Sequence, residues 1–326
     1  MGNELTTTAS NPTVLEPLTG QCPTRPSSLW YDAWVRLRKN RAAMAAIGVI
    51  AVMVLLAIFA HQIAPYSYAE QDLTYTWGEP NRQHLMGTDG LGRDILSRLL
   101  YGARISITVG LVADVIILLI GVPLGLLSGY FGGWRDTLIM RFVDVMYAFP
   151  DLLLVIIIMT FVRGNLSSSS NALLAPLVFI NESTGGLLGV FIALGLTSWL
   201  TVARIVRSQA LCLKEGEFVE AARSVGASQM RIIRVHILPN ALGPIIVAAA
   251  FYIPRAIMLE AALSFLGLGV NPPMASWGGM IADGVSAMRS YPHMVIAPAL
   301  FLSANLLAFN FLGDGLRDAL DPSLRQ

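Results

Sequence analysis

The sequence has little charge and only two cysteines, and these shortages exclude several classes of protein. Only 13% of its 326 residues are charged, whereas 55% are hydrophobic, and the net charge is +1. A soluble domain of this length rarely has so little charge, so a polytopic membrane protein is favoured. The near-neutral balance argues against a nucleic-acid-binding surface. Cys22 and Cys212 lie far apart without metal or redox spacing, which indicates free thiols.

Catalytic motifs are missing as well. The sequence contains no G-x-x-x-x-G-K-[ST] phosphate loop, no H-E-x-x-H and no G-x-S-x-G. Its four histidines are scattered without ligand spacing. Gly313-Asp314 lies next to an apolar stretch, as in aspartyl intramembrane proteases, but the rest of that signature is absent. A membrane-embedded enzyme is therefore disfavoured, and any ATP hydrolysis must come from another protein.

Long apolar stretches dominate the chain, and a membrane span needs about 20 such residues. Six stretches qualify: Ala42–Ile63, Ile105–Leu127, Leu138–Val162, Gly185–Val206, Ala241–Leu263 and His293–Gly313. A shorter run, Ala172–Ile180, cannot cross alone. We therefore expect a membrane domain over residues 42–313, an N-terminal tail over 1–41 that is partly disordered, and a C-terminal tail over 314–326. The tail from Thr6 to Ser28 is rich in Thr, Ser and Pro, and no signal peptide precedes the first span.

The distribution of Lys and Arg predicts the orientation of the spans. Basic residues gather before the first span and between spans four and five: Arg36, Arg38, Lys39, Arg41, Arg207, Lys214, Arg223, Arg231 and Arg234. With six spans these two segments and the C-terminus share one side, so both termini are expected in the cytoplasm. The loop from Ala64 to Arg104 has four arginines, but five acidic residues accompany them.

The spans themselves carry small and ionisable residues. Gly121, Gly125, Gly129 and Gly133 recur every fourth residue and predict one smooth helical face for close packing. Five ionisable residues fall in or near spans, where each is costly unless paired or wet: Asp114, Arg141, Asp144, Arg255 and Glu260. Arg141 and Asp144 suit interhelical pairing or snorkelling. Asp114 is nearer a span centre and is predicted to face a cavity or a partner subunit.

A charged segment between spans four and five has the clearest helix signals in the chain. Phe218, Ala221, Ala222 and Val225 recur at helical spacing and predict one apolar stripe. Gly226 is placed to stop this helix with a left-handed cap. Such a short stripe cannot stabilise an isolated helix, so it packs either on this chain or in a groove of another protein.

A second short helix is expected directly after the turn. Ser228 can cap this helix, which should run through Arg234, and Pro239 suits the first turn of span five. The segment therefore reads as helix, turn and second helix, feeding a membrane span.

The residues of this segment resemble a known family. Glu220-Ala221-Ala222, then Gly226, then Leu238-Pro239, is similar to the cytoplasmic EAA loop of ABC-importer permeases, with His236 where the general pattern often has Ile. Several further blocks resemble the peptide-importer branch, C-type oligopeptide or dipeptide permeases: Gly87-Thr88-Asp89, Gly92-Arg93-Asp94, residues 101–106, 129–133, 263–269 and 313–322. The segment from Arg163 to Thr184 is longer than the family usually has.

The resemblance implies an all-α polytopic membrane protein with the type I ABC importer permease fold: six transmembrane helices and a cytoplasmic EAA coupling helix within the loop 207–240. It implies four kinds of partner in a bacterial inner membrane, namely a second homologous permease, two cytoplasmic ATPases, an extracytoplasmic peptide-binding protein and the lipid bilayer. ATP and Mg would be used by the ATPases, with no cofactor bound by this chain. The residues implied in ATPase coupling are Glu220, Ala221, Ala222, Gly226, Leu238 and Pro239.

The resemblance also bears on substrate and on the loop from Ala261 to Tyr291. That loop is expected outside, bent by its glycines and prolines, with Met274 and Ser276 meeting the binding protein or the pathway. Oligopeptides are the expected substrate, with dipeptides and nickel or another chelated metal as alternatives. A channel stays open as a different class, but it would need no cytoplasmic coupling helices, and copurifying ATPases would exclude it.

Overall fold

The structure is a computed structural model that describes residues 29–167 and 175–321. The regular secondary structure of the described residues is helical, and their one β-type pairing is an isolated bridge between Thr88 and Asp94. The elements in chain order are α1 (Leu29–Lys39), α2 (Arg41–Ile58), α3 (Ala60–Ile63), α4 (Ile95–Phe131), α5 (Gly133–Tyr147), α6 (Asp151–Ser167), α7 (Ala175–Ser183), α8 (Leu187–Leu213), α9 (Glu217–Ser224), α10 (Gln229–Ile232), the π-helix η1 (Ile233–Ile237), α11 (Leu238–Phe265), α12 (Trp277–Val285) and α13 (His293–Leu320). The predicted disordered tail Thr6–Ser28, with Cys22, and the last five residues of the predicted C-terminal tail lie outside the described residues.

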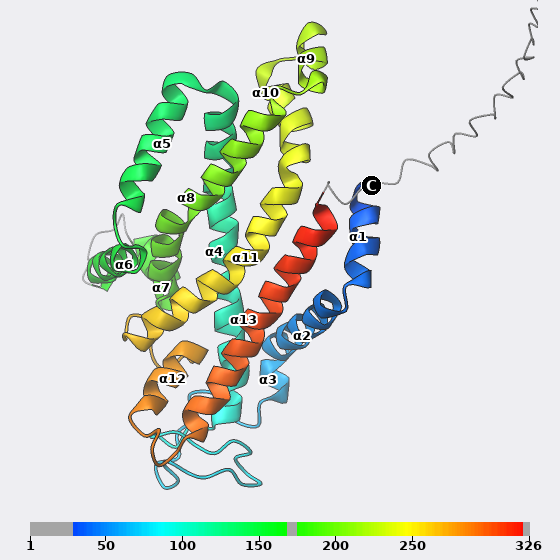
Figure 1. Cartoon of the computed structure of the whole chain (residues 1–326). Helices are drawn as coiled ribbons and strands as arrows, with labels where there is room; N and C mark the ends of the chain where they lie inside the picture. The colour runs from blue at the N-terminus through cyan, green and yellow to red at the C-terminus, as the bar shows by residue number, and fades with distance from the viewer. Residues whose placement is uncertain (1–28, 168–174, 322–326) are drawn as a thin grey trace, which may run out of the picture.

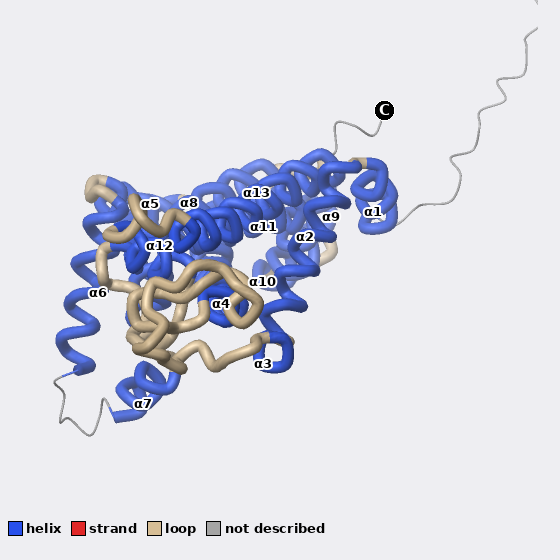
Figure 2. Tube along the Cα trace, turned by 90° about the horizontal axis from the view of Figure 1, so that it is seen from below, coloured by secondary structure: helices blue, strands red, loops and turns tan. Residues whose placement is uncertain are grey.

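The body of the molecule is a bundle of long helices that run past one another (Figure 1). α4 packs along α8, α11 packs against both α4 and α13, and α2 packs against α13. α9 stands at one end of the bundle, whereas α12 and the loop between α3 and α4 lie at the other end (Figure 1). Seen from that second end, this loop covers the beginning of α4, and α6 and α7 form one edge (Figure 2). The predicted cytoplasmic and external segments therefore lie at opposite ends.

Five helices of the described residues are long and apolar enough to cross a membrane: Arg41–Ile58, Ile95–Phe131, Leu187–Leu213, Gln229–Phe265 and His293–Leu320. They confirm the first, second, fourth, fifth and sixth predicted spans. The second begins ten residues before the predicted Ile105, because Asp94 caps it by accepting a hydrogen bond from the Ser97 amide at 2.7 Å. The sixth helix continues beyond Gly313 to Leu320, and α1 is a helix that the sequence analysis did not predict.

The third predicted span is not one continuous helix. The segment Leu138–Val162 is divided between α5 and α6, which meet at 91°. Pro150 lies in the break, where its missing amide hydrogen and its effect on the preceding residue end the first helix. The pair counts as a sixth span only if the two helices together cross the membrane as a broken helix.

Three of the four predicted small-residue positions bring α4 close to α8. A Cβ atom at Gly125 would lie 2.6 Å from the Ala203 carbonyl oxygen, and one at Gly129 would lie 2.6 Å from that of Arg207. Gly121 approaches the Trp199 carbonyl in the same way, at 2.9 Å. Gly133 is the exception, because the chain turns at Gly132 and a Cβ at Gly133 would meet no atom within 4 Å. The predicted glycine face therefore ends one turn early.

The segment after α6 contains a short helix of its own. α7 covers nine residues, Ala175–Ser183, which is too short to cross a membrane. This agrees with the prediction for Ala172–Ile180, of which residues 172–174 lie outside the described residues. α7 packs on α6 and α8.

Candidate functional site

The charged segment after α8 forms the short helix α9 predicted from its sequence. Glu217 and Glu220 lie in its first turn, where carboxylates complement the helix dipole. Gly226 has a φ of +83°, the left-handed conformation expected of the cap. The Gly226 amide donates to the Arg223 carbonyl at 2.9 Å, and the Ala227 amide donates to the Ala222 carbonyl at 3.0 Å. These two bonds form a Schellman cap, so the turn is firmly defined.

The predicted apolar stripe of α9 does not pack on this chain as one face. Val219 is the fully buried residue of the helix, and Ala222 packs beside it against the core between α4, α8 and α11. Phe218 is 41% exposed and Val225 is 88% exposed. Phe218, Ala221 and Val225 are exposed on a surface that the described residues leave uncovered.

The second short helix continues directly into a membrane span. Ser228 caps it as predicted, because its hydroxyl accepts a hydrogen bond from the Arg231 amide at 3.4 Å. The predicted end at Arg234 is wrong, since α10, η1 and α11 form one continuous helical stretch. Pro239 lies in the first turn of α11 and has no amide hydrogen for the turn before it. A π-helical turn precedes it, and the Asn240 side chain donates to the His236 carbonyl at 2.6 Å.

Two ion pairs connect the broken third span to its neighbours. Asp144 of α5 contacts Arg204 of α8 at 2.6 Å, and Asp151 of α6 contacts Arg255 of α11 at 2.7 Å. The interhelical pairing predicted for Asp144 is confirmed, whereas Arg141 is exposed on α5. All four side chains of these pairs are between 41% and 61% exposed. Charged groups exposed on apolar spans are costly against lipid, which indicates a wet or partner-covered surface.

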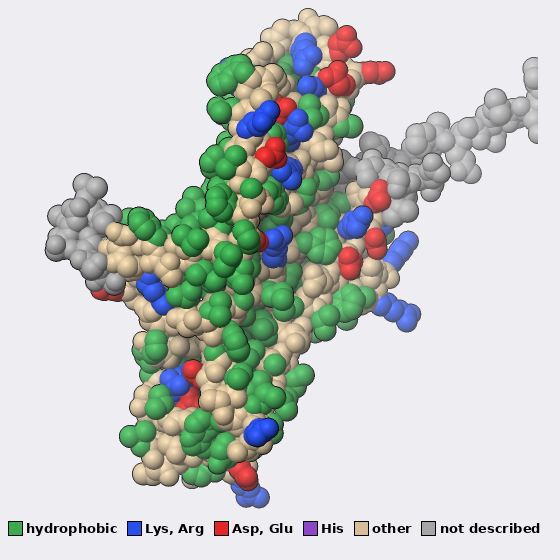
Figure 3. Space-filling view, turned by 60° about the vertical axis from the view of Figure 1, so that its left-hand side comes forward, with side chains coloured by type: hydrophobic (Ala, Val, Ile, Leu, Met, Phe, Trp, Pro, Cys, Tyr) green, Lys and Arg blue, Asp and Glu red, His purple; other side chains and the backbone are tan. Residues whose placement is uncertain are grey.

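A polar hollow lies beside the second pair. Asp151, Arg255, Tyr147, Thr201 and Tyr252 line it together with apolar side chains. The Tyr147 and Thr201 hydroxyls are hydrogen-bonded to each other. The surface on the α5 and α6 side is largely hydrophobic, with basic and acidic side chains together at several places (Figure 3).

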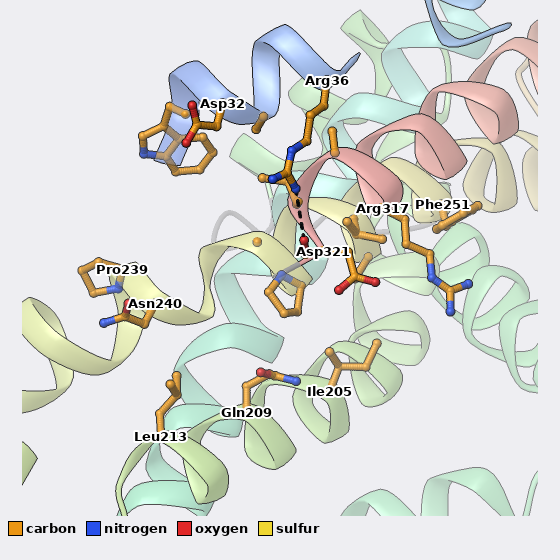
Figure 4. A pocket seen from close by; sticks show the side chains of 18 of the residues that line it. Asp32, Arg36, Ile205, Gln209, Leu213, Pro239, Asn240, Phe251, Arg317 and Asp321 are labelled. Atoms are coloured by element: carbon orange, nitrogen blue, oxygen red, sulfur yellow. Dashed lines mark hydrogen bonds between the residues drawn. The ribbon is translucent and has the colours of Figure 1, made fainter. Parts of the chain in front are cut away.

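A larger cavity of about 890 Å³ opens between α1, α8, α11 and α13. Arg36, Gln209 and Arg317 line it from three of these helices (Figure 4). The Arg36 guanidinium donates to the Asp321 carbonyl at 3.5 Å across its edge. The cavity extends from Pro239, at the α9 end, to Tyr252, which it shares with the polar hollow.

Two buried carboxylates lie deeper in the bundle. Asp114 is 7% exposed, and its Oδ1 has no hydrogen-bond partner among the described residues. Its predicted role toward a cavity or a partner subunit stays a prediction. Glu260 is fully buried in α11 and accepts a hydrogen bond from the Ser264 hydroxyl at 2.6 Å.

The two residues proposed for external contact differ in accessibility. Ser276 is only 1% exposed and caps α12, accepting a hydrogen bond from the Gly279 amide at 3.2 Å. Ser276 is therefore covered by its own chain in this conformation, and its predicted contact with the binding protein or the pathway stays a prediction. Met274 is half-buried, and its sulfur lies against Gly185 at the start of α8. The loop is structured as predicted, because it contains the helix α12.

The motif blocks near residue 90 have a structural role. Arg93 pairs with Asp89 at 2.6 Å, and both Arg93 and Arg98 reach Asp283 of α12 at 3.5 Å. His84 adds a 3.0 Å contact to Asp94. Burial raises the pKa of the Asp283 carboxyl, although the two arginines act in the opposite direction. The network fixes the loop before α4 onto α12, at the end of the molecule opposite α9.

The sequence analysis did not identify the residues that pair with or surround the charged residues Asp144 and Arg255. Arg204, Asp151, Tyr147 and Tyr252 were not singled out, although Asp151 directly follows the span-breaking Pro150. In the part of the chain that the structure describes, no three His, Cys, Asp or Glu side chains lie close enough together to hold a metal ion.

Comparisons with known proteins agree with this architecture. Residues 121–326 match the family described as binding-protein-dependent transport system inner membrane component, and residues 28–82 match the N-terminal TM domain of oligopeptide transport permease C. The chain is 43% identical over 299 residues to the oligopeptide transport system permease protein OppC of Bacillus subtilis, covering 92% of this chain and 91% of that protein. It is 43% identical over 304 residues to the dipeptide transport system permease protein DppC of the same organism, covering 93% and 88%.

Other relatives carry different substrate names, and one solved structure shares the fold. The glutathione transport system permease protein GsiD of Escherichia coli O6:K15:H31 is 42% identical over 298 residues, covering 91% of each chain. The inward-facing MetNI methionine ABC transporter aligns with a TM-score of 0.55 and 20% identity, covering 70% of this chain and 98% of that chain. At this identity the likeness concerns the fold alone.

Proposed function

The chain belongs to the family of binding-protein-dependent transport system inner membrane components, and we propose that it is the permease subunit through which an ATP-driven importer moves oligopeptides into the cell. It would form the pathway together with a second, homologous permease. Peptides would be delivered by an extracytoplasmic binding protein. Its relatives include permeases of oligopeptide, dipeptide and glutathione transport systems, which supports a short peptide as the substrate.

The observation that carries the coupling part of this proposal is the outward surface of α9. The helix is fixed on one side by Val219 and ended by the Gly226 cap, yet Phe218 and Ala221 are exposed. A short helix held rigidly but left uncovered is suited to a groove on another protein. We propose that the two ATPase subunits, which use ATP and Mg, hold α9 of this chain and the corresponding helix of the second permease. This chain would bind no cofactor and catalyse no reaction.

Glu220, Ala221, Ala222, Gly226, Leu238 and Pro239 are the proposed coupling residues. Ala221 would allow close approach of the ATPase, and Ala222 and Gly226 would keep the helix and its turn in place. The continuous path from α10 through η1 into α11 would carry a displacement of α9 into the fifth span. Leu238 and Pro239 lie where this path enters the membrane helix.

The positive residues near α9 and α1 support a cytoplasmic position for that end of the molecule. α1 and the carboxyl end of α13 lie toward the same end (Figure 1). Both termini would then be cytoplasmic, in a bacterial inner membrane. The opposite end, with α12 and Met274, would face the binding protein.

The test is uptake by cells that lack this gene and by the same cells with the gene restored. We expect restored cells to accumulate a labelled tripeptide or tetrapeptide, and affinity purification of the subunit to recover two ATPases. Restored uptake of nickel without peptide uptake would replace the peptide assignment with a metal one. Recovery of the subunit without any ATPase, under conditions that keep other importers intact, would contradict the assignment to an ATP-driven importer.

A further inference from the structure

The Asp151–Arg255 pair is unusual for its position. Arg255 lies 17 residues into α11, near the middle of the fifth apolar span, and Asp151 begins α6 at the break of the third. Both side chains are about half exposed, at 41% and 53%. A charged group in a span is expected to face a water-filled passage or another protein rather than lipid. In the proposed importer, a surface of this kind would face the passage between the two permeases.

The groups around the pair are those that bind a carboxylate. Arginine offers five N–H donors in a planar fork that matches a carboxylate with two parallel bonds. Among the described residues, Arg255 uses one such bond, from Nη2 to the Asp151 Oδ2 at 2.7 Å. The adjoining hollow presents hydroxyl groups from Tyr147 and Thr201. Arg255 can therefore accept a second carboxylate while Asp151 holds it in position.

The other ion pair of this surface lacks these features. Arg204 is paired with Asp144 at 2.6 Å, and its guanidinium lies 4.2 Å from the centre of the Tyr147 ring, whereas the Arg255 guanidinium lies farther, at 5.9 Å, from the centre of the Tyr252 ring. One face of the Arg204 guanidinium is therefore covered. Neither Arg204 nor Asp144 lines the hollow. The two pairs have the same charges and similar distances, which makes Arg204 a matched control.

We propose that Arg255 binds the C-terminal carboxylate of the transported peptide during its passage, with Asp151 as the positioning residue. This inference rests on the proposed function, and it assigns one substrate group to one residue of the pathway. Tyr252 lines both the hollow and the cavity that reaches the α9 end, so the two lie on opposite sides of one side chain. A carboxylate on a substrate side chain has the same chemistry, and the test separates the two sources.

The experiment uses the complete importer in proteoliposomes, with its binding protein and ATP. Uptake is measured for Ala-Ala-Ala, for its C-terminal amide, and for Ala-Glu-Ala amide, in which the only carboxylate is on a side chain. For each variant, uptake of the free acid is divided by uptake of the amide, and this ratio is compared with that of the original protein. Because the binding protein is the same in every sample, its own preference cancels in the comparison. Arg255→Gln is expected to reduce this ratio about tenfold, as loss of a charged hydrogen-bonded contact predicts.

Three further variants separate recognition from helix packing. Asp151→Asn removes the carboxylate that positions Arg255, so it should weaken the preference for the free acid, but less than Arg255→Gln does, because Arg255 remains. Arg204→Gln should leave the ratio within about twofold, since that arginine is outside the hollow. The exchange Asp151→Arg with Arg255→Asp rebuilds an ion pair of reversed direction and should not restore the preference. Equal rescue of uptake and ratio by the exchanged pair would overturn the assignment of the carboxylate to Arg255.

The remaining outcomes are also decisive. An unchanged ratio in Arg255→Gln, with the complex assembled and its basal ATPase activity retained, would overturn the inference and leave the peptide importer intact. A loss specific to Ala-Glu-Ala amide would assign Arg255 to side-chain carboxylates and overturn the terminal assignment. If the original complex accumulated none of the three peptides, the proposed function itself would fail.

Discussion

Gly226 shows how one residue fixes the position of the coupling helix. Its φ of +83° lies in the left-handed region, and a Cβ there would meet no atom within 4 Å. A side chain is therefore opposed by backbone conformation alone, at about 1–2 kcal/mol. Gly226→Val should leave the subunit inserted but strongly reduce peptide uptake and loosen the ATPases. Gly243→Ala is the control, because its added methyl group makes only an ordinary 3.9 Å contact. Normal uptake and copurification at high salt in Gly226→Val would contradict the coupling assignment.

Ala221 and Ala222 differ in a way that decides which of them is the better probe. Ala222 packs against this chain's own core, so a large side chain there would disturb the subunit itself. Ala221 is exposed, and overpacking at an interface costs about 1–3 kcal/mol. Ala221→Trp should weaken copurification of the ATPases while the thermal unfolding of the isolated subunit stays unchanged. Ser224→Trp, also exposed on α9, tests whether any bulky side chain on the helix has this effect. Full ATPase recovery with Ala221→Trp would place the interface elsewhere.

The helix caps and turns were the part of the site that the sequence predicted well. Gly226, Ser228 and Pro239 act on the backbone within a few residues, so their effects follow from residue type alone. The inward residue of α9 was misjudged because Val219 is selected by the core it meets. Burial of Ser276 likewise depends on a neighbouring element. The Asp151–Arg255 pair joins residues 104 positions apart, a separation across which one sequence carries no signal.

At the scale of elements, the contact between α4 and α8 depends on missing side chains. A Cβ at Gly125 would lie 2.6 Å from the Ala203 carbonyl oxygen and 2.7 Å from the Val206 Cβ. Both neighbours belong to a packed helix, so Gly125→Ala should force the helices apart at about 1–3 kcal/mol. We expect a lower unfolding temperature of the detergent-solubilised subunit. Gly48→Ala is the matched control, since its Cβ would meet nothing within 4 Å. Equal unfolding temperatures of the two variants would contradict the close packing.

The apolar spans were predictable as elements because length and composition determine them. The positions where the spans begin and end were less predictable. Asp94 extends the second span by capping it, and Pro150 divides the third, which places Asp151 next to Arg255. A proline within a span signals an interruption, but the 91° between α5 and α6 depends on what surrounds them. The Asp136–Arg207 contact, with two bonds of 2.6 Å, is one such constraint, since it holds the start of α5 against α8.

At the scale of the whole molecule, the two ends of the bundle should lie on opposite sides of the membrane. Asn81 belongs to the loop at the α12 end, and Ser228 lies beside α9; both are exposed. In a background without Cys22 and Cys212, a membrane-impermeant thiol reagent should label Asn81→Cys in intact cells. Ser228→Cys should react only after the membrane is opened. Labelling of Ser228→Cys from outside would reverse the orientation on which the coupling assignment depends.

The central claim is that this chain forms, with a second permease, a peptide pathway driven by separate ATPases. The most direct measurement is accumulation of a labelled tripeptide inside proteoliposomes that contain the purified complex. The account predicts accumulation against a gradient only when ATP, Mg and the peptide-loaded binding protein are all present, with loss of accumulation in Gly226→Val. Peptide equilibration that needs no ATP would indicate a channel, and ATP hydrolysis without peptide accumulation by an intact complex would contradict the account.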